Sequence, residues 1–141
     1  MFKSGTAITI AATLFASSAI AFDPNDVQKL NETNECTRCD LRNANLNGLR
    51  LNDAILFGAN LGGAYLINTG LSGANLRGAF LGEAILTLAD LTEADLSSSD
   101  LRGANLEGAD LSSADLTRAR MTGAIFCNTI MPDGLVLYSG C

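Results

Sequence analysis

The chain has 141 residues, a formal net charge of −6, and neither His nor Trp. This length allows one domain, and the hydrophobic share of 48% comes mostly from Ala and Leu at fixed places, which is a repeat composition. The sequence lacks His, a basic stripe with aromatic residues and a phosphate-binding Gly loop, which argues against an enzyme and against a nucleic-acid-binding protein. We expect no catalytic residue, no cofactor and no metal.

Residues 1–21 have the pattern of a secretory signal peptide. Lys3 supplies a positive start, residues 7–20 form a short apolar run, and Ala19-Ile20-Ala21 is a small-x-small cleavage motif. The alternative is an uncleaved anchor, but the run is short for a bilayer span of about 20 residues. We expect an exported mature chain of residues 22–141, with membrane contact only through the signal peptide.

Residues 22–38 are expected to form an N-terminal helical cap. Asp23-Pro24 is typical of a helix start, with an N-cap residue before Pro at the first helical position. Val27 and Leu30 share one helix face, so we expect a short helix over about residues 24–33. The end of a stacked β-structure exposes apolar side chains and free backbone groups, and this helix would cover one such end.

In residues 39–128 a Leu returns every fifth residue, and Met121 and Phe126 continue the series. A step of five turns a helix by about 500°, so the Leu would spiral around it, and in a strand they would alternate between faces. They share one core only if the chain bends once per repeat, and four bends close a coil of twenty residues. Stacked coils pair as β-ladders about 4.8 Å apart, which predicts an all-β solenoid. The inward Leu are Leu41, Leu46, Leu51, Leu56, Leu61, Leu66, Leu71, Leu76, Leu81, Leu86, Leu91, Leu96, Leu101, Leu106, Leu111 and Leu116.

The residue two places before each Leu is usually Ala and should also point inward. Four Leu and four further side chains in each layer leave room only for small residues. The departures are Cys39, Leu49, Thr69 and Ser99. The buried hydroxyls of Thr69 and Ser99 each need a hydrogen-bond partner.

The Ala-(Asp/Asn)-Leu-x-x pattern, as in Ala94-Asp95-Leu96, Ala104-Asn105-Leu106 and Ala109-Asp110-Leu111, resembles the pentapeptide repeat family. The resemblance covers residues 39–128 in eighteen repeats and implies a right-handed quadrilateral β-helix of about four and a half coils. The short helix, the C-x-x-C motif and the tail are similar to exported cyanobacterial and chloroplast members, which implies a periplasm or a thylakoid lumen. The resemblance implies no particular task.

The four cysteines, Cys36, Cys39, Cys127 and Cys141, are expected to form disulfides, because their number is even and the chain is exported. In a coil of twenty residues, Cys39 and Cys127 lie about 20 Å apart along the axis at the strand spacing. Disulfide Cα atoms lie within about 7 Å of each other. This leaves the pairs Cys36–Cys39 and Cys127–Cys141.

Two other interpretations of the Cys36-Thr37-Arg38-Cys39 motif stay open. Reactive C-x-x-C thiols are activated at helix N-termini, whereas this motif follows the predicted helix, whose dipole disfavours a thiolate there. A redox pair is therefore less favoured than a structural disulfide. Zinc is less favoured still, because one pair supplies two of four ligands and the chain has no His.

Residues 129–141 are expected to form a C-terminal capping tail. Met131-Pro132-Asp133-Gly134 has the composition of a turn. Leu135, Val136 and Leu137 are expected to cover the last Leu layer.

Residues between the inward positions point to solvent, and those twenty positions apart stack in columns. One side concentrates five apolar residues: Tyr65, Ile67, Ile85, Leu88 and Ile125. This set predicts a dimer or partner surface. The alternatives are cover by a terminal segment, or scattered exposure without meaning.

Another side is acidic, with Asp90 stacked on Asp110 and Asp95 stacked on Asp115. Like charges about 4.8 Å apart are expected to raise each other's pKa. Such columns suggest cation binding or imitation of a phosphate backbone, as cytoplasmic relatives that inhibit DNA gyrase are thought to do. The interpretation that we favour is that Asp and Asn here are turn formers bonded to the local backbone.

The function indicated is a non-enzymatic exported scaffold that binds an unknown protein partner. Two alternatives come from other classes. One is a DNA-mimic inhibitor of a DNA topoisomerase, which the signal peptide disfavours, and the other is a thiol redox protein that uses Cys36 and Cys39. The sequence leaves the oligomeric state open.

Overall fold

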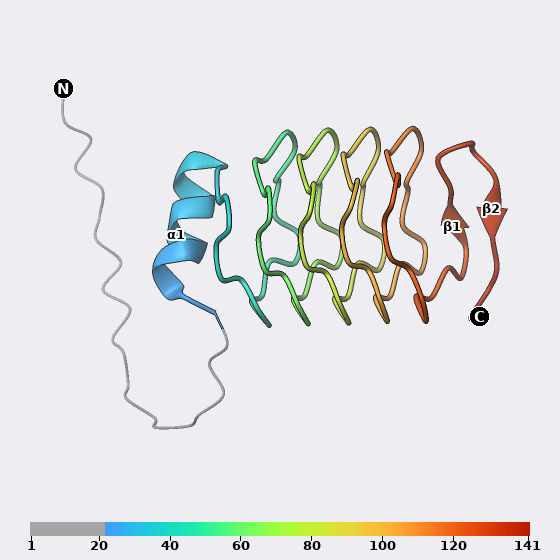
Figure 1. Ribbon diagram of the computed structural model, residues 1–141, viewed down its shortest axis with the longest axis horizontal. Helices are drawn as coiled ribbons and strands as arrows, with labels where there is room; N and C mark the ends of the chain where they lie inside the picture. The colour runs from blue at the N-terminus through green and yellow to red at the C-terminus, as the bar shows by residue number, and fades with distance from the viewer. Residues whose placement is uncertain (1–21) are drawn as a thin grey trace.

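The computed structural model describes residues 22–141, and the predicted signal peptide lies outside this part of the chain. The described chain is a rod with a helix at its N-terminal end, a stack of coils in the middle and a short hairpin at its C-terminal end (Figure 1). Helix α1 spans Pro24–Thr33. Strands β1 and β2 span Thr129–Ile130 and Val136–Leu137.

The stack of coils is held by parallel β-bridges between residues twenty positions apart, from Glu35 with Ile55 to Asp110 with Ile130. A turn follows each bridge, and four bridges complete one coil. Backbone amides of each coil donate to carbonyls of the next coil, as Leu61 does to Phe80 at 2.7 Å. The architecture is the mostly β arrangement that the period of five predicts.

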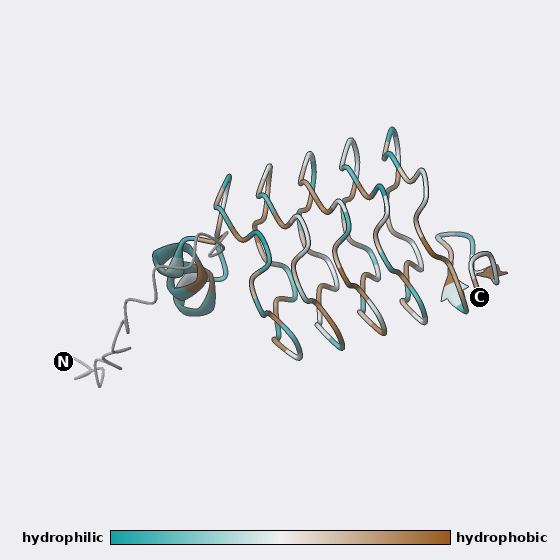
Figure 2. Ribbon diagram, turned by 90° about the horizontal axis from the view of Figure 1, so that it is seen from below, coloured by the Kyte–Doolittle hydropathy of each residue, from teal (hydrophilic) through white to brown (hydrophobic). Residues whose placement is uncertain are grey.

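The interior of the coils is a column of Leu and Ala. Every Leu of the series from Leu41 to Leu111 is at most 3% exposed, and apolar residues recur at the same place in successive coils (Figure 2). The Thr69 hydroxyl donates to Leu46 O at 2.9 Å, and the Thr129 hydroxyl donates to Leu106 O at 2.7 Å. Ser99 departs from our expectation, because its buried hydroxyl has no partner among residues 22–141.

The N-terminal end of the rod is sealed by α1. Asp23 caps the helix by accepting the Asn25 N–H at 2.9 Å, and Pro24 occupies the first turn. The helix buries Leu30, which is 1% exposed, against the first coil. One turn into the helix, Asp26 accepts the Asp40 N–H at 2.7 Å, which ties α1 to the coil beneath it. The helix thus covers an end that would otherwise expose Leu side chains and free backbone groups.

The C-terminal end is covered differently from our expectation. Strand β2 pairs antiparallel with β1 and continues the backbone ladder by one short layer. The side chains that we expected to cover the last Leu layer are themselves exposed, by 65% at Leu135, 41% at Val136 and 37% at Leu137. That prediction is wrong, because β2 adds to the edge of β1 and does not fold across the open coil.

Candidate interaction surfaces

The coils have four sides, because outward residues twenty positions apart stack on one another. We name each side after one residue on it and keep these names below. The Phe80 side comprises 40–43, 60–63, 80–83, 100–103 and 120–123; the Tyr65 side 45–48, 65–68, 85–88, 105–108 and 125–128; the Asp90 side 50–53, 70–73, 90–93, 110–113 and 130–133; and the Asp95 side 35–38, 55–58, 75–78, 95–98 and 115–118.

The Tyr65 side holds all five apolar residues that the sequence singled out. Tyr65 forms a bridge with Ile85, and Asn105 separates Ile85 from Ile125. Tyr65 is 44% exposed and Leu88 is 56% exposed, while the other three are half-buried. We call the continuous set Tyr65, Ile67, Ile85 and Leu88 the Tyr65 patch. Ile125 lies apart from the patch, against the C-terminal tail: a methyl group added at Gly140 would lie 3.2 Å from Ile125 Cγ2.

Leu88 occupies an unusual backbone position within the Tyr65 patch. It has φ +57°, in the left-handed region, where the other described residues are Gly or polar. This region disfavours residues with bulky side chains. The Leu88 side chain lies over Gly108 of the next coil, where an added methyl group would come within 2.7 Å of Leu88 Cδ2. The same place in every described corner turn has a positive φ, so the fold imposes this conformation, and what is unusual is the apolar side chain that Leu88 presents there.

The four predicted acidic residues lie on two neighbouring sides, which corrects our assignment to one. Asp90 forms a bridge with Asp110, and Asp95 forms a bridge with Asp115, as the stacking predicts. The two columns are one repeat apart, however, and one repeat turns the chain by one side. The negative charge is therefore divided across a corner of the rod.

Each of these carboxylates is bound to its own turn. The Oδ1 atom accepts the backbone N–H two residues later: from Thr92 to Asp90 at 3.1 Å, from Ser97 to Asp95 at 2.9 Å, from Ser112 to Asp110 at 2.9 Å and from Thr117 to Asp115 at 2.8 Å. The neutral residues Asn45, Asn60, Asn75 and Asn105 accept the equivalent N–H. The geometry supports the turn-former interpretation, since the same bond forms with or without charge.

The pKa of Asp115 moves against our expectation for stacked carboxylates. Hydrogen bonds from the side chain and backbone of Thr117 lower the pKa of Asp115, and the charge of Arg77 adds to this effect. Together these contacts favour the ionised form more than burial disfavours it. At Asp115 the expectation of a raised pKa is wrong.

Two ion pairs of the same design lie on the Phe80 side. Arg42 Nη2 is 2.7 Å from Asp40 Oδ2, and Arg102 Nη2 is 2.5 Å from Asp100 Oδ2. Hydrogen bonding by Arg42 lowers the pKa of Asp40, and hydrogen bonding by Arg102 lowers the pKa of Asp100 to about 2. Gly82 and Glu83 complete a shallow hollow of about 350 Å³ beside Asp100 and Arg102. In this hollow the Asp100 carboxylate is held by Arg102.

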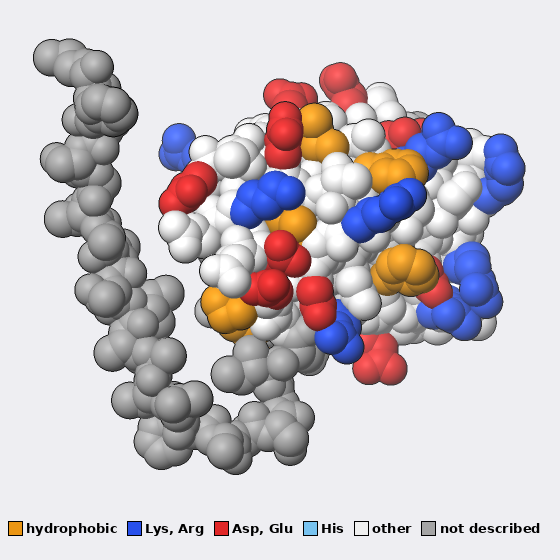
Figure 3. All heavy atoms as spheres, turned by 60° about the vertical axis from the view of Figure 1, so that its left-hand side comes forward, with side chains coloured by type: hydrophobic (Ala, Val, Ile, Leu, Met, Phe, Trp, Pro, Cys, Tyr) orange, Lys and Arg blue, Asp and Glu red, His pale blue; other side chains and the backbone are white. Residues whose placement is uncertain are grey.

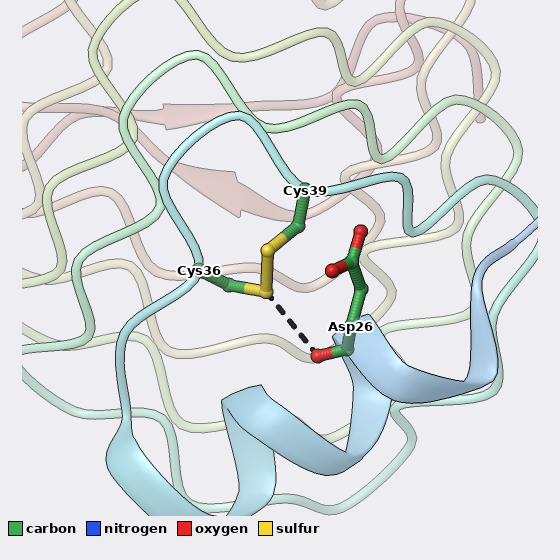
Figure 4. Close-up of side chains that lie close together, drawn as sticks. All are labelled: Asp26, Cys36 and Cys39. Carbon is green, nitrogen blue, oxygen red and sulfur yellow. Dashed lines mark hydrogen bonds between the residues drawn. A yellow bond between two sulfur atoms is a disulfide. The ribbon is translucent and has the colours of Figure 1, made fainter.

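The two cysteines of the C-x-x-C motif lie beneath α1. Cys36 and Cys39 are joined as a disulfide with Cα atoms 5.3 Å apart, and they are 0% and 5% exposed. Cys36 Sγ is 3.2 Å from the carbonyl oxygen of Asp26 (Figure 4). A disulfide sulfur carries no hydrogen, so this is a packing contact. The sulfurs and the Asp26 carboxylate are close enough to ligate one ion, but a disulfide is not the thiolate pair that a metal needs.

The second disulfide joins Cys127 to Cys141, with Cα atoms 4.7 Å apart. Cys127 lies on the Tyr65 side, and the Phe126 N–H donates to Ser139 O at 2.9 Å. The bond thus holds the end of the tail against the last repeat. The pairing in the structure is the one that we expected from the sequence.

Three further apolar residues are exposed on other sides, and we did not predict them from the sequence. Phe80 is 54% exposed on the Phe80 side, and Ile55 and Phe57 are 40% and 36% exposed on the Asp95 side. The signal was present at Phe80, which stands where most repeats have Asp or Asn. Over the face drawn in Figure 3, hydrophobic side chains stand singly among charged ones.

Stacked coils with inward Leu, corner turns and outward columns define a β-helical solenoid. Residues 35–69, 71–108 and 94–131 match the sequence profile of the family described as pentapeptide repeats, in eight copies. Because the match covers more than half of the chain, the chain belongs to the pentapeptide repeat family.

Solved structures of this family resemble the rod. The pentapeptide repeat protein alr5209 from Nostoc PCC 7120 is 33% identical, with a TM-score of 0.53, over 74% of this chain and 79% of that protein. HetL, from Nostoc sp. strain PCC 7120 and involved in heterocyst differentiation regulation, is 32% identical with a TM-score of 0.46 over 73% of this chain; the chain spans 60% of HetL's length. QnrB1, a plasmid-mediated fluoroquinolone resistance protein, is 22% identical with a TM-score of 0.53, over 62% of this chain and 50% of that protein.

No curated protein sequence matches the chain at a significant level. Within residues 22–141, α1 is too short and too polar to cross a bilayer, and no other described segment forms a spanning helix.

Proposed function

We propose that residues 22–141 form an exported, non-enzymatic scaffold whose outward sides bind a protein partner. The scaffold consists of the N-terminal cap (22–38), the repeats (39–128) and the tail (129–141). We infer the right-handed sense of its four-and-a-half coils from its family. The observation that carries the proposal is the Tyr65 patch, a continuous set of apolar side chains on a backbone ladder that every coil repeats.

The Tyr65 patch suits binding because it is formed before a partner arrives. The Tyr65 N–H donates to Ala44 O and the Ile85 N–H donates to Ala64 O, both at 2.9 Å. A backbone fixed on both sides loses little freedom on association, which favours affinity. Tyr is enriched in protein interfaces, and the buried centre of an interface is more apolar than the rest of a protein surface.

The chemistry of the described side chains favours binding over catalysis. The Asp carboxylates bond to their own turns, the hollow beside Gly82 holds one ion pair and Glu83, and both Cys of the C-x-x-C motif are buried in a disulfide. A catalytic site needs convergent groups that titrate or attack substrate. We do not propose the redox function, because both Cys of the motif are buried in a disulfide. We do not propose the DNA-mimic function, because the carboxylates act as turn formers and the signal-peptide pattern disfavours a cytoplasmic target.

We propose a periplasm or a thylakoid lumen as the compartment. The two disulfides support an oxidising compartment, since such bonds persist there and are rare in the cytosol. The signal-peptide pattern of residues 1–21 supports export by an independent route.

The test is affinity capture with crosslinking, after fractionation of cells that express the full chain. We expect the mature protein in the exported fraction, crosslinked to a partner that Leu88→Asp no longer captures. Phe80→Asp is the matched control, because Phe80 is exposed to a similar degree on another side. Capture of the same proteins by wild type and Leu88→Asp would remove the Tyr65 patch from the proposal.

A further inference from the structure

The Tyr65 patch lies on a side of the rod that carries almost no charge of its own. Among the ranges that make up the Tyr65 side, Glu107 is the single charged residue. The other outward residues of this side are Asn, Thr, Gly, Cys and the apolar residues already described. A partner therefore meets an apolar centre whose charge comes mainly from its border.

Three exposed carboxylates border the Tyr65 patch. Glu83 lies in the corner turn two residues before Ile85. Asp90 comes two residues after Leu88, at the start of the next side. Glu107 lies on the Tyr65 side itself, in the next coil. The apolar centre thus has a negative charge before it and after it along one coil, and another in the coil that follows.

The side chains of Glu83 and Leu88 occupy equivalent places in two successive corner turns. Their φ angles are +58° and +57°. A methyl group added at Gly103 would lie 3.4 Å from Glu83 Cγ, and one added at Gly108 would lie 2.7 Å from Leu88 Cδ2. Both side chains therefore extend toward the next coil, one on each side of Ile85. The same geometry that presents the apolar Leu88 at one corner presents a carboxylate at the other.

The carboxylates of Glu83 and Glu107 are available to a ligand. Both ion pairs of the described chain lie on the Phe80 side and include neither residue. The Asp90 carboxylate is partly occupied, because its Oδ1 atom accepts the backbone N–H and the hydroxyl of Thr92. Glu83 and Glu107 are thus the stronger candidates for a contact with a cationic group.

The cations near the patch do not offset these charges. Arg42 and Arg102 lie in the coils before and after the patch, and each is held by the Asp of its own turn. Arg50 is exposed, but it lies on the Asp90 side, one coil before the level of the patch. Residues 80–99, the coil that supplies half of the patch, contain four Asp or Glu and no Lys or Arg.

We propose that the Tyr65 patch binds a protein segment that places an apolar side chain between basic residues. This inference rests on the proposed function and names the chemistry of the partner. The apolar side chain packs on Ile85 and Leu88. One basic residue pairs with Glu83, and another pairs with Glu107 or Asp90 at the opposite border. An acidic segment, an anionic lipid surface or the Tyr65 side of a second copy would bring negative charge to this border, and like charges in an interface disfavour association.

A random-peptide display library tests the proposal on the immobilised, oxidised mature protein. Peptides are kept when they bind wild type and fail to bind Leu88→Asp. We expect the kept sequences to carry an aliphatic or aromatic residue flanked by Lys or Arg. Kept sequences that lack basic residues would overturn this inference and leave the patch as a binding site. A library that yields only peptides that Leu88→Asp still binds would overturn both this inference and the role of the patch in the proposed function.

Charge reversal at the border separates this contact from attraction by the overall negative charge. Fluorescence anisotropy with a kept peptide measures the Kd. We expect Glu83→Lys to weaken binding by at least about 5-fold at low salt, and by less at high salt, because salt screens exposed charges. Glu93→Lys is the matched control: Glu93 is in the same coil with φ +59°, but two repeats further on, at the opposite corner. Equal Kd values for the two variants would overturn the proposal.

Discussion

The two ends of the rod adjoin coils that are built from the same repeat, but the two ends are closed in different ways. At the N-terminal end, α1, the Cys36–Cys39 disulfide and the Asp26 carboxylate cover the first coil, and Leu41 is fully buried. At the C-terminal end, a two-strand hairpin adds to part of the last coil, and Leu116 is half-buried. Identical positions in the repeat thus have different burial.

This difference shows that burial in a solenoid is a property of neighbours. A repeat supplies an inward Leu, but only the layer above and the layer below remove it from water. At the N-terminal end, helix α1 covers the first Leu layer. At the C-terminal end, the tail extends the ladder by one incomplete layer. The following measurements test the comparison.

The largest contrast should come from a charge placed in each end layer. Leu41→Asp should prevent folding, because an unpaired carboxylate would enter a dry layer at a cost of several kcal/mol. Leu116→Asp should still fold cooperatively with a lowered Tm, because solvent reaches this layer. Circular dichroism melts of dilute protein measure both variants. Equal loss of structure in the two would mean that the C-terminal layer is as closed as the N-terminal one.

A smaller contrast is expected between the caps themselves. Leu30→Ala should lower the free energy of unfolding by about 2–5 kcal/mol, since Leu30 is buried under α1. Leu137→Ala, at a residue 37% exposed, should cost less than about 1 kcal/mol. Urea denaturation of the dilute variants gives both values. A Leu137→Ala cost that matches that of Leu30→Ala would show that the tail is a cap of equal strength.

The two disulfides should differ in how easily they are reduced. Cys36 and Cys39 are buried, whereas Cys141 is exposed, and exchange needs access for the attacking thiolate. A mild dithiol should therefore reduce Cys127–Cys141 first, with a loss of about 3 kcal/mol for a loop of roughly fifteen residues. Alkylation and mass spectrometry identify the reduced pair, and Cys141→Ser should reproduce the loss of stability. Earlier reduction of Cys36–Cys39 would restore the redox interpretation of that motif.

The smallest effect concerns the matched ion pairs Asp40–Arg42 and Asp100–Arg102, near opposite ends of the Phe80 side. Both carboxyl pKa values are lowered by the neighbouring Arg, to about 2 at Asp100. Each pair therefore stabilises the fold above the ordinary Asp pKa of 3.8, and the Asp100 contribution is lost as the pH falls from there to about 2. NMR titration should show both shifts, and Arg102→Gln should return the pKa of Asp100 toward 3.8. Titration of wild-type Asp100 near 3.8 would contradict the pairing.

The period of five was sufficient to predict the inward Leu, the stacking of residues twenty apart and the turn role of Asp and Asn. These features repeat, so each copy supports the same interpretation. The placement of Tyr65, Ile67, Ile85, Leu88 and Ile125 on one side followed from the same spacing. The placement of both acidic columns on one side was an avoidable error, because Asp90 and Asp95 are one repeat apart and therefore belong to neighbouring sides.

Less could be predicted where the repeat stops. The tail has no period, so nothing in its composition distinguishes a strand added to an edge from a segment folded across an end. The pKa of Asp115 depends on the Thr117 hydrogen bonds and on Arg77, which lies on the same side two coils earlier. The expectation of a raised pKa considered only the stacked Asp residues and therefore left out both contacts.

The corner turns have a consequence for how such a surface changes over time. Asp and Asn accept the same amide at a corner, so exchanging one for the other alters the charge by one unit and leaves the backbone bond in place. Single exchanges of Asp and Asn can thus change the electrostatic potential of a side, while the backbone hydrogen bonds between coils stay in place. Recognition and foldability are thereby subject to separate selection.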